Sequence, residues 1–246
     1  MLLALFLIDL AAGLYLFLPL VGRRNAGVKF YRLILITSGV LALCSSLADF
    51  SASGGTFRIR GLPAIALTLV VYATLRYPKR LIFRIPAALL GIVYIILPVA
   101  AWHEATHAPF GWSIAGALSS VALLGSVNLA MLLGHWYLVV RGMAIDPLKR
   151  LTIATLAATI VKIAVVTIAI VAGGAWYEVA VRQGIFFWMH AGWGLLGPLL
   201  LYPMVWGTVK IRSTMAATGI LYVDVVAVVI GEVLGAWLSA MVHLPV

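Results

Sequence analysis

The stretch 184–210, GIFFWMHAGWGLLGPLLLYPMVWGTVK, is long and apolar enough to cross a lipid bilayer as a helix. It carries one histidine, His190, near Gly192, Gly194 and Gly197, and two prolines follow. A titratable side chain inside lipid is costly, so it usually faces protein and often marks a site. The stretch therefore predicts an integral membrane protein with a binding helix around His190.

The rest of the chain has the same character. Of its 246 residues, 64% are hydrophobic and only 10% are charged, a balance that excludes a soluble globular domain. About 20 apolar residues span the hydrocarbon layer, and eight such segments are predicted: 2–21, 33–49, 61–77, 85–102, 112–140, 151–172, 184–209 and 214–242. The expected fold class is all-α, a polytopic transmembrane helix bundle of about eight spans in a single integral membrane domain, 1–246.

The net charge of +10 could indicate nucleic-acid binding, but the basic residues lie in short loops between the predicted spans. Thirteen of the 17 fall in odd-numbered loops: Arg23, Arg24, Lys29, Arg32, Arg76, Lys79, Arg80, Arg84, Arg141, Lys149, Arg150, Lys210 and Arg212. Even-numbered loops hold only Arg58, Arg60 and Arg182. This asymmetry predicts cytoplasmic odd loops and both termini outside a cytoplasmic-type membrane. The expected partner is the lipid bilayer, and no nucleic acid is expected. Tryptophans near the outer span ends, Trp102 and Trp188 among them, are expected to form an interfacial belt.

A weak internal repeat relates the two parts of the chain. Residues 84–95 align with 212–223, and the first and fifth spans share a polar-Leu-Ala sequence at Asp9 and Asn128. Both pairs of spans run in the same direction through the membrane, as a parallel 4+4 duplication with halves 1–110 and 111–246 would require. Chance similarity between two apolar sequences is the alternative.

Four charged side chains fall deep inside predicted spans: Asp9, Lys162, Asp224 and Glu232. Lone charges in lipid are expensive, so pairing is expected, and Lys162 is predicted to pair with Asp224 or Asp9 at matched depth. The four residues could form a proton path, or buried ion pairs that fix the helix register.

Two histidines in spans are candidate ligands for a b-type haem or neighbours of a quinone. His190 has Gly192 close by, while His135 follows Gly134 and lies on the same helix face as Asn128. Imidazole beside small residues admits a flat macrocycle. The depths of the two histidines differ by about 10–20 Å, so they are not expected to ligate one haem together.

Residues 103–107 read His-Glu-Ala-Thr-His, a spacing that can place two imidazoles on one helix face for a zinc peptidase. Pro109 follows closely, and no third ligand stands in a familiar position. A metallopeptidase is therefore not expected, although His103 and His107 remain candidate ligands for a loop metal. The single cysteine, Cys44, excludes an intrachain disulfide and a cysteine-based metal site.

Taken together, these features favour a membrane subunit of a redox or proton-coupled complex. Such a subunit would bind haem or quinone in the bundle, take part in electron transport and proton transfer, and contact other membrane subunits. If it is an enzyme, it is at most an oxidoreductase subunit. Two alternatives stay open: a small-molecule or ion transporter, and a purely structural or assembly subunit.

Overall fold

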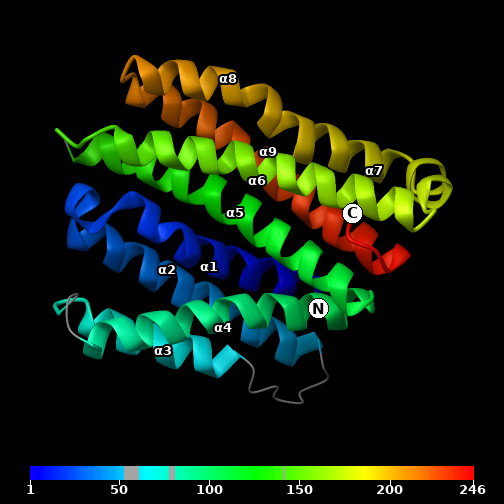
Figure 1. Ribbon diagram of the computed structural model, residues 1–246, viewed down its shortest axis with the longest axis horizontal. Coiled ribbons are helices and arrows are strands. Elements are labelled where there is room, and N and C mark those ends of the chain that lie inside the picture. The colour runs from blue at the N-terminus through cyan, green and yellow to red at the C-terminus, as the bar shows by residue number, and fades with distance from the viewer. Residues whose placement is uncertain (53–60, 78–80, 141) are drawn as a thin grey trace.

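The computed structural model describes residues 1–52, 61–77, 81–140 and 142–246. Within these ranges the chain is helical and contains no strand, which confirms an all-α bundle (Figure 1). Of the basic residues used for topology, Arg58, Arg60, Lys79, Arg80 and Arg141 lie outside the described residues.

The helices follow the predicted spans closely. In order they are α1 (Leu2–Val21), α2 (Arg23–Ala52), α3 (Leu62–Thr74), α4 (Leu81–Thr106), α5 (Phe110–Val139), α6 (Asp146–Ala172), the π-helix η2 (Tyr177–Arg182), α7 (Ile185–Met189), the π-helix η3 (His190–Leu196), α8 (Gly197–Lys210) and α9 (Thr214–Val242). In the described part, seven continuous helical segments are long and apolar enough to cross a membrane, the sixth being α7, η3 and α8 together. The chain is therefore an integral membrane protein.

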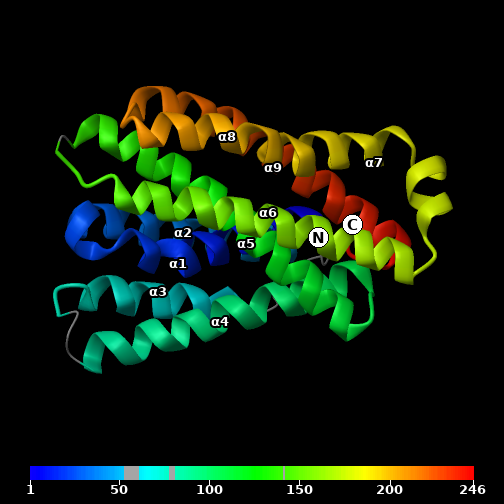
Figure 2. The same ribbon diagram turned by 45° about the horizontal axis from the view of Figure 1, so that its top comes forward.

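The helix in the third predicted span, 61–77, is shorter than expected. This helix, α3, has 13 residues, or about 20 Å, whereas the hydrocarbon layer is about 30 Å thick. Successive passes nevertheless run antiparallel, and both chain ends lie in the same half of the bundle (Figures 1 and 2). Helix α2, by contrast, is longer than the predicted 33–49 and bends at Gly27, whose φ of 77° few side chains tolerate.

The centre of the bundle is a close crossing of α1 and α5. A methyl group on Gly13 would lie 2.5 Å from the Cα of Gly125, so the two backbones are in direct contact. Such contacts between small residues are the usual way for helices to associate in lipid, where burying apolar surface gains nothing.

The helices before and after residue 110 have matching neighbours. Helix α1 packs on α2 and α4, and α3 packs on the same two helices; likewise α5 packs on α6 and α9, and so does α8. A parallel duplication with halves 1–110 and 111–246 would give this order of neighbours, and the duplication stays a prediction.

Candidate functional site: a buried polar cluster

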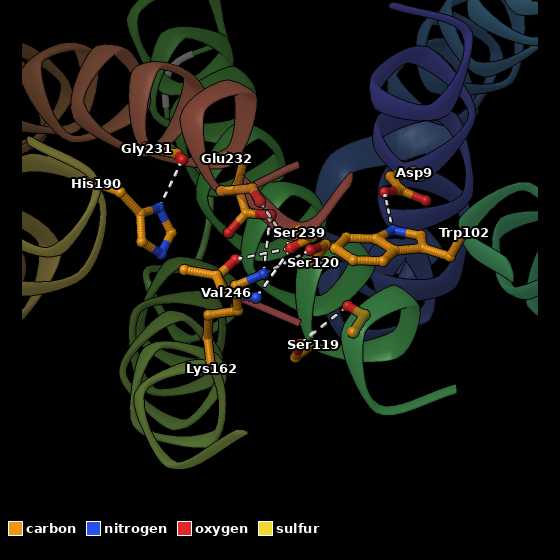
Figure 3. A network of polar contacts seen from close by, with 12 residues as sticks. Asp9, Trp102, Ser119, Ser120, Lys162, His190, Gly231, Glu232, Ser239 and Val246 are labelled. Carbon is orange, nitrogen blue, oxygen red and sulfur yellow. Dashed lines mark hydrogen bonds and ion pairs between the residues drawn. The ribbon is translucent and has the colours of Figure 1, made fainter. Parts of the chain in front are cut away.

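A buried ion pair joins α6 to α9. The Nζ atom of Lys162 lies 3.3 Å from Oε2 of Glu232 and donates a second hydrogen bond, of 2.8 Å, to the hydroxyl of Ser120 on α5. The two charged side chains are 0% and 4% exposed. The Lys162 ammonium also lies 5.5 Å from the centroid of the Trp102 ring, within range of a cation–π interaction (Figure 3).

The prediction that Lys162 pairs with Asp224 or Asp9 is wrong, because Lys162 forms its ion pair with Glu232. Helices α6 and α9 end at the same side of the bundle (Figure 1). Lys162 and Glu232 each lie ten residues before the end of their helix. Asp224 lies eight residues further from that end of α9, which is about 12 Å along the helix axis. Asp9 accepts a hydrogen bond from a different residue.

That residue is Trp102, whose indole N–H donates a 2.8 Å hydrogen bond to Oδ2 of Asp9 and so links α4 to α1. Trp102 is 1% exposed. Its assignment to an interfacial belt is therefore wrong, whereas Trp188 is exposed as expected. A buried carboxylate needs hydrogen-bond donors, and here an indole supplies one.

His190 is fully buried at the first residue of η3, and its Nδ1 lies 2.7 Å from the carbonyl oxygen of Gly231. A carbonyl only accepts, so we assign the ring proton to Nδ1, which leaves a lone pair on Nε2 of the neutral ring. The ring edge packs on Gly235, where an added methyl group would lie 2.7 Å from Cε1. Two successive turns on one face of α9 thus contact the imidazole.

Three polar atoms of this cluster are buried without a hydrogen-bond partner in the described part of the chain: Asp9 Oδ1, Glu232 Oε1 and His190 Nε2. Lys162 and Glu232 are electrostatic neighbours of both Asp9 and His190. Figure 3 shows the ion pair between the His190 ring on one side and the Trp102–Asp9 pair on the other. Orphaned polar atoms of this kind are normally satisfied by internal water. Such water would also connect groups that bind protons.

The polar cluster is closed toward the chain ends by the residues that follow α9. His243 adopts a left-handed conformation, with φ 57°, and the chain turns back. The backbone N–H of Val246 then donates a 2.9 Å hydrogen bond to Ser239, and Val246 is fully buried.

A small cavity of about 60 Å³ lies nearby between α1, α2 and α4, with Asp49 and Glu104 on its wall. It has room for a few waters.

The other predicted site residues lie apart from this cluster. Asp224 is buried on α9 but makes no ion pair with Lys162. Asn128 donates to the carbonyl of Leu124 on its own helix. His135 is exposed near the opposite end of the bundle from His190, 3.4 Å from the hydroxyl of Tyr222.

The glycines expected to admit a flat cofactor have other surroundings. A methyl group on Gly134 would lie 2.8 Å from the hydroxyl of Thr218, so the space there is taken by α9. Gly192 faces outward and borders a shallow apolar groove that His190 does not line. Because Nε2 of His190 is buried in the described part of the chain, a haem could reach it only if the groups packed around the ring moved apart. The residues present therefore do not fit a haem at His190.

The His103–His107 spacing does not produce a zinc face. Helix α4 ends at Thr106, and His107 has φ 52°, outside the helix. Nδ1 of His103 lies 3.0 Å from the carbonyl oxygen of Ala108. Among the described residues, no group of three or more His, Cys, Asp or Glu side chains is arranged to hold a metal ion.

Sequence reasoning missed Ser120 and the role of Trp102. The adjacent pair Ser119-Ser120 in the middle of a span was a usable signal, because a hydroxyl there needs a partner. Trp102 gave no such signal, since tryptophan near a span end is common at the membrane interface.

No family model, no curated protein and no solved structure matches this chain.

Proposed function

We propose that this protein handles protons within the membrane, as a subunit of a proton-coupled complex, and that Glu232 is the group that exchanges the proton. The observation that supports this is the enclosed Lys162–Glu232 pair, with His190 and Asp9 as its electrostatic neighbours. Ionisable residues inside a membrane are rare because they are costly, and they are kept where protons or ions move.

The hydrogen bonding supports a division of roles. Nζ of Lys162 donates to both Ser120 and Glu232, so it is the hydrogen-bond donor of the cluster. Oε1 of Glu232 makes no hydrogen bond within the described chain, so it is the free acceptor for an incoming proton. Nε2 of His190 offers a second acceptor. A proton on Glu232 would pass through a bridging water to this lone pair, and the reverse step would return it to Glu232.

The redox part of the prediction gains no support from the packing. A b-type haem does not fit at His190, and His135 is exposed on the other end of the bundle. A quinone beside either histidine stays a prediction. A transporter that carries a large solute past the buried polar cluster gains little support, since the cavity that lies nearest to it holds only about 60 Å³. The serious rival is a structural role, in which the ion pair only fixes the register of α6 relative to α9.

Potential-driven proton uptake into proteoliposomes, followed with an enclosed pH dye, tests the proposal. The full chain should take up protons faster than empty liposomes, and Glu232→Gln should reduce uptake to the level of empty liposomes. Glu178→Gln is the matched control, because Glu178 pairs with Arg182 on the exposed surface and its loss should leave the flux unchanged.

A second readout covers a subunit that conducts protons only inside its complex. Infrared spectra recorded across a pH series should show a carboxyl band that titrates in the unmodified protein and disappears in Glu232→Gln. If neither the flux nor this band depends on Glu232, the proton proposal is wrong and the structural role replaces it.

A further inference from the structure

We propose that the basic end of the bundle binds an anionic phospholipid, with its headgroup on Arg23 and its acyl chains in a cavity between α1, α2, α3 and α4. This site lies in the half of the bundle away from the buried polar cluster and does not depend on proton handling.

The cavity has a volume of about 520 Å³. Its wall is largely apolar, with Leu16, Leu18, Leu35, Val71, Leu75 and Phe83 from four helices. A volume of this size is within the range of small-molecule sites, and in a membrane its natural contents are hydrocarbon chains.

Among the described polar side chains on the cavity wall, Arg23 has a hydrogen-bond donor without a partner. Tyr15 donates its hydroxyl proton to the carbonyl of Ala87 at 2.7 Å, and Tyr31 donates to that of Leu18 at 3.2 Å. Arg23 donates to the carbonyl of Leu75 through Nη2, whereas its Nη1 is buried and has no partner in the described chain. A ligand in this cavity must therefore present an acceptor to the guanidinium.

The positive charge of Arg23 and its neighbours favours an anionic hydrogen-bond acceptor over a neutral one. Arg23 forms no ion pair with a described acid. Of the seven Asp and Glu residues in the chain, Asp146 at the start of α6 lies nearest to this end of the bundle, and no ion pair joins it to Arg23. Arg24, Arg76 and Arg84 lie on neighbouring segments and are exposed. A neutral carbonyl would accept a hydrogen bond but would leave this positive charge uncompensated, whereas a phosphodiester does both.

Binding of matched lipids tests the site. Delipidated full-length protein in detergent is titrated with phosphatidylglycerol or with phosphatidylcholine of the same acyl chains, and bound lipid is counted by native mass spectrometry. Both headgroups carry a phosphodiester, but the choline of phosphatidylcholine cancels its charge. The uncompensated positive charge at this end therefore predicts a preference for phosphatidylglycerol of about tenfold. Arg23→Gln should abolish this preference, and Arg24→Gln, one residue along and exposed, should keep it.

A second variant tests the cavity without touching the charge. Gly91 lines the cavity, and a methyl group there would meet only Tyr15, at 3.9 Å. Gly91→Leu should fill the space, keep the fold and weaken phosphatidylglycerol binding. Equal binding of the two lipids, or an unchanged preference in Arg23→Gln, would overturn the proposal. Arg23-dependent displacement of the lipid by a neutral quinone would assign the cavity to the quinone instead.

Discussion

Lys162 and Glu232, which are 70 residues apart in the sequence, meet 3.3 Å apart in the bundle interior. Neither helix could bury its own charge alone, because an uncompensated ion in a low-dielectric interior costs several kcal/mol. The pair therefore ties α6 to α9 in the bundle interior, where both helices pack on α5.

Removing one member of the pair should destabilise the protein more than removing both. Lys162→Met leaves Glu232 buried without its cation, and we expect a loss of about 3–5 kcal/mol in the free energy of unfolding. Lys162→Met combined with Glu232→Leu should recover most of this loss, since apolar replacements of a buried pair are often neutral. Denaturant unfolding followed by circular dichroism measures both. Additive losses in the double variant would contradict the coupling, and Arg182→Met at the exposed pair is the control.

The crossing of α1 and α5 should not tolerate a side chain. Gly125→Ala would put a methyl group 2.4 Å from the backbone of Gly13, so the helices must separate. We expect a loss of about 1–3 kcal/mol or more in the free energy of unfolding.

At Gly207 and Gly219 a methyl group meets nothing within 4 Å among the described residues. Alanine at these two positions should be neutral or stabilising, by up to about 1 kcal/mol. Equal effects at buried and exposed glycines would argue against the close crossing.

Substitutions of His190 should separate its structural hydrogen bond from its free nitrogen. Asparagine can place an amide N–H where Nδ1 lies and keep the bond to Gly231. His190→Asn should therefore be about 1 kcal/mol more stable to unfolding than His190→Leu. Neither variant has an acceptor at the Nε2 position, so both should lose the proton flux proposed above. Thermal melts and proteoliposome flux, measured on the same preparations, distinguish the two roles. Full flux in His190→Leu would exclude the ring from the proton path.

The charge asymmetry predicts the orientation of the bundle in the membrane. A reporter fused after Lys149 should read cytoplasmic, because its loop is basic. A reporter fused after Gly174, between α6 and η2, should read external. Enzymatic reporters active on only one side of the membrane measure this directly. If the reporter after Lys149 reads external and the one after Gly174 reads cytoplasmic, the predicted orientation is wrong, whereas the antiparallel order of the passes still holds.

The fold class was readable from the sequence because it depends on local properties. The length and hydropathy of each apolar run identify a membrane helix without reference to any neighbour, and the predicted spans 2–21 and 214–242 coincide with α1 and α9. The presence of a buried polar site was also readable, since charges at the positions of Lys162 and Glu232 must find partners.

Which residues meet was decided only by the tertiary structure, because it depends on how each helix is rotated about its axis. Both lipid-facing and buried surfaces of membrane helices are apolar, so hydrophobicity does not mark the inner face. Ile160 and Val161 are half exposed beside the fully buried Lys162. Gly194 meets Gly231, while Gly192, two residues earlier in η3, faces outward. For the same reason the sequence indicated that Lys162 needs an acid, and only the packing of α6 on its neighbours selected Glu232 over Asp224.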